Sequence, residues 1–131
     1  MNTTRIQRVL ENLSADGLSQ ALITDPLSIW YLTGYYTEPY ERFLLAQDSS
    51  AAAGFRTTLF CNRLFPDASG FADQIVAFDD TEDPIALVSD VAERDMPLGI
   101  DKELSARWLL PLMDAGVATS FALASTAVDA A

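Results

Sequence analysis

The stretch QALITDPLSIWYLTG, residues 20–34, decides the fold class of this chain. Residues 20–24 form a short apolar run of the kind found in buried strands. Asp25-Pro26 interrupts the run, and Pro26 suits the first turn of a helix, where its missing N–H is not needed. Gly34 is typical of a helix end. A strand followed at once by a helix predicts an α/β arrangement.

The same alternation extends along the chain in both directions. Upstream, apolar residues at helical spacing predict a helix over residues 4–16, capped by Thr3 or Thr4 and followed by Gly17. At the C-terminal end, residues 124–131 are mostly small, and we expect them to be weakly structured. Downstream, the patterns predict strands at 42–46, 57–62, 74–78, 97–100 and 118–123, and helices at 63–73, 83–94 and 105–116, with Ser105 as a cap and Pro111 as a kink.

These elements predict one domain with an α/β fold. The expected sheet is mixed, mostly parallel and five- to six-stranded, with helices on both faces and a hairpin between the second and third strands. No phosphate-binding glycine pattern follows any strand, so a dinucleotide or P-loop role has no support. The fold class alone implies no function.

The charge balance excludes two classes of partner. A net charge of −11 argues against nucleic acid and against an anionic membrane surface, both of which need clustered cations. The acids gather in residues 67–95, which hold nine acids and one base. A solvated face is the favoured interpretation of this segment, and an acidic docking surface is the alternative. The N-terminal residues lack an apolar signal core, and we expect a cytoplasmic protein.

The absence of histidine limits the chemistry. It excludes a Ser-His-Asp triad, a Cys-His pair and an imidazole metal site. The lone Cys61 lies in an apolar run and is expected to be a small buried hydrophobe. The acids of residues 79–83 lack the spacing of a calcium loop. We therefore favour a helix cap at Thr81 or Asp83 over a metal site.

The segment TGYYTEPYERFLLA, residues 33–46, carries an unusual density of aromatic and charged groups. Tyrosines in a loop between turn residues favour an interface or a substrate gate, with ordinary surface as the alternative. Arg42 begins a predicted strand, where it could tie the loop down, which we favour, or bind a peptide carboxylate. Glu41 and Arg42 could also form a simple surface pair. We expect core packing for at least one of Trp30 and Tyr31, and core or interface packing for Trp108.

Four segments, in order, resemble the N-terminal domain of the creatinase/prolidase family. They are RIQRVLENLSADGLSQALITDPLSIWYLTGYYTEPYERFLLA, TTLFCN, AFDDTEDP and LGIDKELSARWLLPL. The likeness covers residues 3–129 and is greatest to Xaa-Pro dipeptidases and aminopeptidases. The long run from residue 17 to residue 35 is the most specific part, and EPYER after it adds weight toward dipeptidases.

The resemblance implies a two-domain enzyme. In that family a C-terminal pita-bread domain holds two divalent metal ions, such as Mn, Co or Zn, through aspartates, a histidine and glutamates. The metals activate a water that attacks the Xaa-Pro carbonyl. That domain is absent from this chain. The resemblance therefore implies no catalytic residue, no metal site and no cofactor within these 131 residues, and no activity for the chain alone.

The resemblance also implies roles for the opening loop. The family's N-terminal domain commonly serves dimerisation and lends this loop to the substrate entrance of the partner subunit. The expected partners are the chain's own C-terminal catalytic domain, a second copy and a proline-containing peptide. Related dipeptidases often carry Asp at position 38 and His at position 40. The expected entrance residues are Tyr36, Glu38, Tyr40, Glu41 and Arg42.

Two alternatives to this interpretation stay open. The chain could be a stand-alone α/β interaction module that binds proteins through its tyrosine loop. It could also belong to another family member, such as a creatinase, because the N-terminal domain does not determine the substrate.

Overall fold

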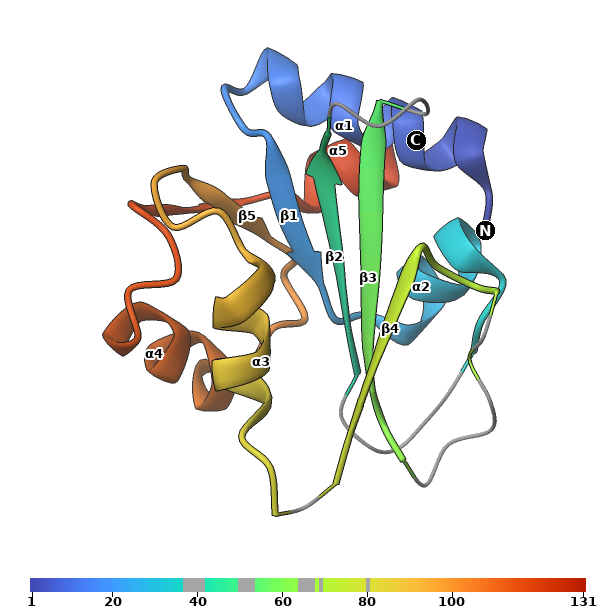
Figure 1. The fold of residues 1–131 in the computed structure, drawn as a ribbon. Coiled ribbons are helices and arrows are strands. Elements are labelled where there is room, and N and C mark those ends of the chain that lie inside the picture. Colours follow the sequence, from blue (N-terminus) through green and yellow to red (C-terminus); the bar gives the residue numbers. More distant parts are fainter. Residues whose placement is uncertain (37–41, 50–53, 64–67, 69, 80) are drawn as a thin grey trace.

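The computed structural model describes residues 1–36, 42–49, 54–63, 68, 70–79 and 81–131. Within them, six strands form one sheet in the order β4-β3-β2-β1-β5-β6 (Figure 1). No helix in these residues is long and apolar enough to cross a membrane. The elements are α1 (Thr3–Ala15), β1 (Gln20–Ile23), α2 (Pro26–Thr33), β2 (Arg42–Asp48), β3 (Phe55–Asn62), β4 (Gln74–Phe78), α3 (Pro84–Val91), β5 (Leu98–Ile100), α4 (Ala106–Asp114), β6 (Phe121–Leu123) and α5 (Ser125–Asp129).

The sheet is mixed, as the sequence predicts. Strand β2 pairs antiparallel with β1 and with β3, and the other three neighbouring pairs are parallel. In this register, Ile23 at the end of β1 lies beside Leu44, and Cys61 near the end of β3 lies beside Arg42. The start of β2 therefore lies at the same end of the sheet as the carboxyl ends of the parallel strands β1 and β3.

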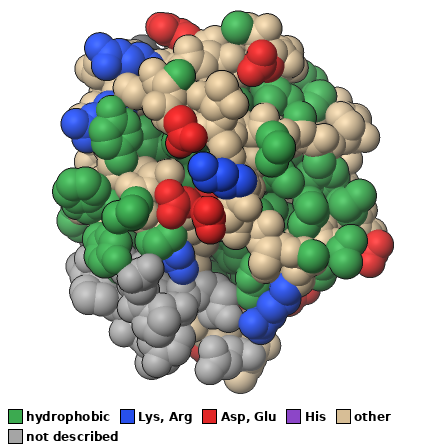
Figure 2. Space-filling model, turned by 180° about the vertical axis from the view of Figure 1, so that it is seen from behind, with side chains coloured by type: hydrophobic (Ala, Val, Ile, Leu, Met, Phe, Trp, Pro, Cys, Tyr) green, Lys and Arg blue, Asp and Glu red, His purple; other side chains and the backbone are tan. Residues whose placement is uncertain are grey.

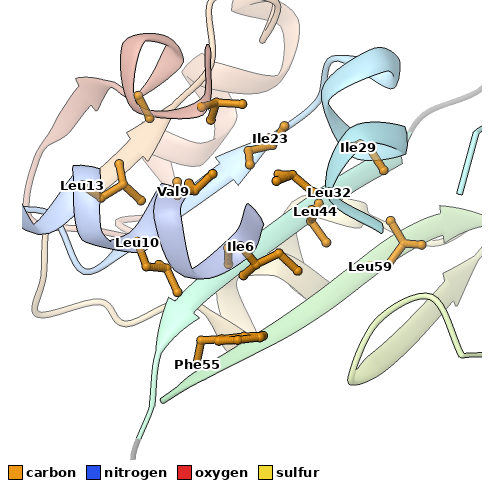
Figure 3. Packing of buried hydrophobic residues seen from close by; sticks show 14 of the residues in the cluster. Ile6, Val9, Leu10, Leu13, Ile23, Ile29, Leu32, Leu44, Phe55 and Leu59 are labelled. Atoms are coloured by element: carbon orange, nitrogen blue, oxygen red, sulfur yellow. The ribbon is translucent and has the colours of Figure 1, made fainter. Parts of the chain in front are cut away.

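Helices cover both faces of the sheet, which confirms the predicted layers (Figure 1). On one face, α1, α2 and α5 pack over a buried cluster that includes Ile6, Val9, Ile29 and Leu32 (Figure 3). On the other face, α3 and α4 pack over a second cluster that includes Val88 and Leu112. Strand β1 is buried along its whole length because it lies between the two clusters. Cys61 is buried within the first cluster, as predicted.

Two predicted caps differ from the structure. Helix α1 is capped by Asn2, whose side chain accepts a hydrogen bond from the Arg5 N–H at 3.0 Å, and not by Thr3 or Thr4. The helix therefore begins one residue earlier than predicted, because Asn is at least as good a cap as Thr. Ser105 does precede α4, but its side chain makes no capping hydrogen bond. Pro111 lies inside α4.

Two predictions about less regular segments are wrong. The predicted helix at 63–73 is not present at residues 63, 68 and 70–73, and its other residues lie outside the described part of the chain. Gly70 has a φ of 87°, and Asp73 accepts from the Thr57 N–H at 2.8 Å, which leads the chain into β4 instead. The last residues, predicted to be weakly structured, form α5. Its Ala127 and Val128 are buried, and Asn12 on α1 donates to the Ala127 carbonyl.

Candidate functional site

The turn between β1 and α2 is held by one buried carboxylate. Asp101, just after β5, accepts from the Thr24 N–H at 2.9 Å, the Thr24 hydroxyl at 2.9 Å and the Asp25 N–H at 2.8 Å. Asp25 in turn accepts from the N–H and the hydroxyl of Ser28 and so caps α2. The Thr-Asp-Pro part of the sequence is therefore a structural corner whose polar groups already have partners within the chain.

The two residues that follow the end of α2 at Gly34 are tyrosines with different degrees of burial. Gly34 ends the helix with a φ of 84°, in the left-handed region that favours glycine. Tyr35 then points inward: its side chain is 5% exposed and its ring centroid lies 5.2 Å from that of Phe71. Tyr36, the next residue, is 51% exposed. The two tyrosines therefore have opposite roles, the first in packing and the second at the surface.

The structure places two of the five predicted entrance residues. Tyr36 is exposed before residues 37–41, and the half-buried Arg42 follows them as the first residue of β2. Arg42 lines a hollow outside the carboxyl end of β1, together with Thr24 and Pro26. Glu38, Tyr40 and Glu41 lie outside the described residues. The entrance role stays a prediction for all five residues.

Helix α2 exposes apolar side chains that sequence reasoning did not single out as exposed. Leu27 is 62% exposed and Trp30 is 52% exposed. In Figure 2, hydrophobic side chains gather at the left of the molecule beside the grey atoms, on the side where α2 lies. The sequence does indicate this exposure, because residues 26–33 carry apolar side chains around the whole helix. Of these apolar side chains, Ile29 and Leu32 are the buried ones that pack in the core.

Tyr31 confirms the expectation that at least one of this aromatic pair packs. It is half-buried against the α1 face, and its hydroxyl donates to the Ala131 carbonyl at 3.1 Å. The Arg5 guanidinium lies 3.9 Å from the ring centroid and donates to the Tyr31 carbonyl. Trp108 also packs as expected, edge-on against Phe43 at 5.6 Å.

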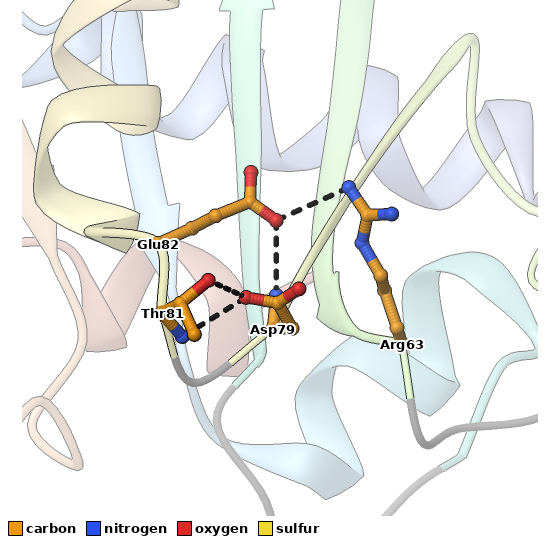
Figure 4. A network of polar contacts seen from close by, with 4 residues as sticks. All are labelled: Arg63, Asp79, Thr81 and Glu82. Atoms are coloured by element: carbon orange, nitrogen blue, oxygen red, sulfur yellow. Dashed lines mark hydrogen bonds and ion pairs between the residues drawn. The ribbon is translucent and has the colours of Figure 1, made fainter.

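The acidic cluster after β4 serves local structure (Figure 4). Asp83 caps α3 by accepting from the Ile85 N–H at 3.0 Å, which is one of the two predicted caps. Asp79 accepts from the hydroxyl and the N–H of Thr81, and these hydrogen bonds lower the pKa of Asp79. Glu82 pairs with Arg63 at 3.1 Å. No group of three or more His, Cys, Asp or Glu among the described residues could hold a metal ion, so these residues do not fit the family's metal pair.

Comparison with known sequences gives the family directly. The model of the creatinase/prolidase N-terminal domain matches residues 5–131, which is nearly the whole chain. Uncharacterized peptidases of Staphylococcus aureus, such as those of strains bovine RF122 and USA300, are 34% identical over 90 residues. That match covers 64% of this chain and 24% of each relative, so it involves about a quarter of the length of those peptidases.

Solved structures share the fold. A proline dipeptidase from Streptococcus pneumoniae superimposes with a TM-score of 0.80 at 22% identity, covering 99% of this chain and 96% of that one. The creatinase/prolidase N-terminal domain of an X-Pro dipeptidase from Streptococcus pyogenes gives 0.78 at 20% identity, with both chains covered in full. The prolidase from Pyrococcus horikoshii gives 0.73 at 13% identity, covering 95% of this chain and 33% of that one. The chain therefore belongs to the creatinase/prolidase family, as an N-terminal domain.

Proposed function

We propose that this chain is the non-catalytic N-terminal domain of an Xaa-Pro dipeptidase-type metallopeptidase, where it serves dimerisation and shapes the substrate entrance of the partner subunit. The observation that supports the proposal is the kind of residue found on either side of residues 37–41. They are followed on one side by Arg42, at the start of the inner strand β2, and preceded on the other by the exposed Tyr36. The exposed Leu27 and Trp30 lie on the helix that leads into this loop.

These side chains suit contact with a proline-containing peptide. Aromatic rings such as Tyr36 and Tyr40 can stack on proline, and a guanidinium such as Arg42 can bind a peptide carboxylate through two parallel hydrogen bonds. Glu38 and Glu41 could accept hydrogen bonds from the peptide amine. The loop would thus orient the peptide and limit its length at the entrance. We assign the metal-dependent hydrolysis itself to the remainder of a longer protein, whose metal ions would activate the attacking water.

A separate apolar surface supports dimerisation. Leu110 and Met113 of α4 and Leu123 of β6 are exposed, and β6 ends the sheet. Figure 2 shows hydrophobic side chains gathered along the right side, where β6 and α4 lie after the half-turn from Figure 1. A second copy is the occupant we propose. With a net charge of −11, two copies repel each other over most of their surfaces and can approach best through an apolar one. Two outer strands could also pair antiparallel about a two-fold axis.

Steady-state kinetics of a longer protein that contains this domain tests the entrance role. Tyr36→Ala, Glu38→Gln, Tyr40→Phe, Glu41→Gln and Arg42→Gln are each assayed with Xaa-Pro dipeptides. We expect kcat/KM to fall by about tenfold or more for at least one charged residue, the size of one lost charge-assisted hydrogen bond. Arg8→Gln, on the exposed side of α1, is the matched control. Unchanged kinetics in all five variants would remove the proposal.

Sedimentation of the same protein tests the dimer surface. We expect Leu123→Glu to shift the protein toward monomer, because it places a carboxylate in an apolar contact. Glu11→Gln on α1 should leave the oligomeric state unchanged. A dimer that is insensitive to Leu123→Glu and to Met113→Glu would show that another surface holds the subunits together.

A further inference from the structure

A hollow of about 270 Å³ lies at the carboxyl end of β1, at the start of β2 and at the start of α4. Its volume is close to the lower end of the range for small-molecule sites. The lining includes Thr24 after β1, Arg42 at the start of β2, and Glu103, Ser105, Arg107 and Trp108 around the start of α4.

The position of the hollow in the sheet is one at which α/β proteins bind ligands. Strands β1 and β5 are parallel neighbours. The chain leaves β1 for α2, which packs with α1 on one face, and leaves β5 for α4, which packs with α3 on the other. Adjacent parallel strands whose connections run to opposite faces leave a crevice outside their carboxyl ends, where ligands of such sheets bind.

The basic groups of the hollow suit a carboxylate. The guanidiniums of Arg42 and Arg107 come from two different elements and line the same space. Arg107 lies in the first turn of α4, and the Ser105 side chain makes no capping hydrogen bond to that turn. Guanidinium binds a carboxylate through paired hydrogen bonds, and the partial positive charge of a helix start adds to the attraction.

The hollow also contains the opposite charge and an apolar wall. Glu103 lines it and, among the described residues, makes no ion pair with an arginine. Pro26 and Trp108 supply a smaller apolar part of the lining. A lining with both charges beside an aromatic ring is complementary to a small molecule that has a carboxylate, an ammonium group and a small apolar part.

We propose that this hollow binds a free α-amino acid or a dipeptide in its zwitterionic form. Arg42 and Arg107 hold the carboxylate, Glu103 holds the ammonium group, and Trp108 and Pro26 contact the apolar part. The site lies within this one chain and needs neither a metal ion nor a second subunit. The site shares Arg42 with the proposed entrance role, but Glu103 and Arg107 belong to the hollow alone. Substitutions of these two residues therefore test the site separately from the entrance role.

Titration of the 131-residue chain, followed by amide NMR signals, tests the proposal. The probes are Gly-Pro, N-acetylproline without an ammonium group, prolinamide without a carboxylate, and inorganic phosphate. We expect Gly-Pro to shift the signals of Thr24 and of residues 105–108 in a saturable way, and to bind more tightly than the other three. Arg107→Gln should weaken Gly-Pro binding by about tenfold, as for one charge-assisted hydrogen bond.

Two further variants separate the possible outcomes. Glu103→Gln should weaken Gly-Pro but not N-acetylproline, whereas Arg8→Gln on the far helix α1 should change neither. Arg8 and Arg107 are both exposed, so we expect both variants to fold. The dispersion of their amide signals checks this. Absence of saturable shifts with Gly-Pro at about 20 mM, where millimolar binding would be seen, would overturn the proposal. Equal binding of phosphate and Gly-Pro would also overturn it, in favour of a general anion site.

Discussion

The segment from Thr24 to Tyr36 has two parts that differ in how their side chains are used. The first half, the corner at Thr24 and Asp25, is tied to the buried Asp101 by three hydrogen bonds of 2.8 to 2.9 Å. The second half begins with Tyr35, which is packed in the core, and turns outward at Tyr36. The resemblance to the family runs through both halves, but the polar groups of the first are used by the fold, whereas the second presents the side chain of Tyr36 at the surface.

The difference separates sequence likeness that maintains the fold from likeness that serves contact. A Thr-Asp-Pro corner is expected wherever this strand and helix must meet, because its polar groups are used within the chain. An aromatic side chain that is half exposed beside a loop presents a large apolar surface to the solvent, which favours a role toward a partner. Substitutions in the two halves should therefore separate stability from function.

The two adjacent tyrosines should give the largest contrast. Tyr35→Ala should lower the free energy of unfolding by about 3–5 kcal/mol, because it empties a buried aromatic site against Phe71. Tyr36→Ala should change it by no more than about 0.5 kcal/mol, as for most surface substitutions. Urea denaturation of the chain measures both. Similar decreases in the free energy of unfolding for the two variants would contradict the assignment of Tyr35 to the core and Tyr36 to the surface.

Removing the corner carboxylate should have the next largest effect. Asp101→Ala leaves two backbone N–H groups and a hydroxyl without their acceptor, which we expect to lower the free energy of unfolding by about 3 kcal/mol. Asp101→Asn keeps one acceptor oxygen and should lose less. Denaturation midpoints at equal m-values give the comparison. A loss below about 0.5 kcal/mol for Asp101→Ala would mean that the corner does not depend on this carboxylate.

The cap of α2 should have a smaller effect. Asp25→Ala removes the acceptor for the Ser28 N–H and hydroxyl and should lower the free energy of unfolding by about 1 kcal/mol. Asp25→Asn should retain most of the stability, since Asn caps as well as Asp. Thermal unfolding of the three chains is the measurement. Equal stability of the Ala variant and the parent would contradict the assigned role.

The smallest predicted effect concerns the titration of Asp79. The hydrogen bond from the Thr81 hydroxyl is the main cause of its lowered pKa, so its folded pKa lies below the ordinary value of 3.8. Any stability from this group is present above pH 3.8 and is lost as the pH falls through the lower, folded pKa. Thr81→Val should raise the Asp79 pKa toward 3.8. An NMR titration that gives the same pKa in both chains would contradict this assignment.

Much of the fold could be predicted from local pattern. The strand at 20–24, the proline-started helix after it and the glycine at its end follow from turn chemistry and apolar runs. The short α5 could not be predicted this way, because its burial depends on contact with α1, which is over 100 residues away. The helix predicted at 63–73 was wrong because helical spacing does not show that Asp73 bonds to Thr57 on β3.

The site was predictable in part. The resemblance identified the loop, and the structure adds that Tyr35 belongs to the core and Tyr36 to the surface. The sequence alone could not show which of the two adjacent tyrosines is buried, because the burial of Tyr35 depends on the position of Phe71 in a distant segment. The hollow beside Arg42 brings together residues from three separate stretches of sequence, and no local motif indicates it.

Activity of mixed dimers tests the central claim most directly. One subunit of a longer protein carries an inactivated catalytic domain with an intact loop. The other carries an active catalytic domain with Glu38→Gln and Arg42→Gln. If the loop serves the entrance of the partner subunit, mixed dimers should recover activity toward an Xaa-Pro dipeptide above that of either parent. Mixed dimers no more active than the loop variant alone would contradict the account, because the loop would then act only within its own subunit.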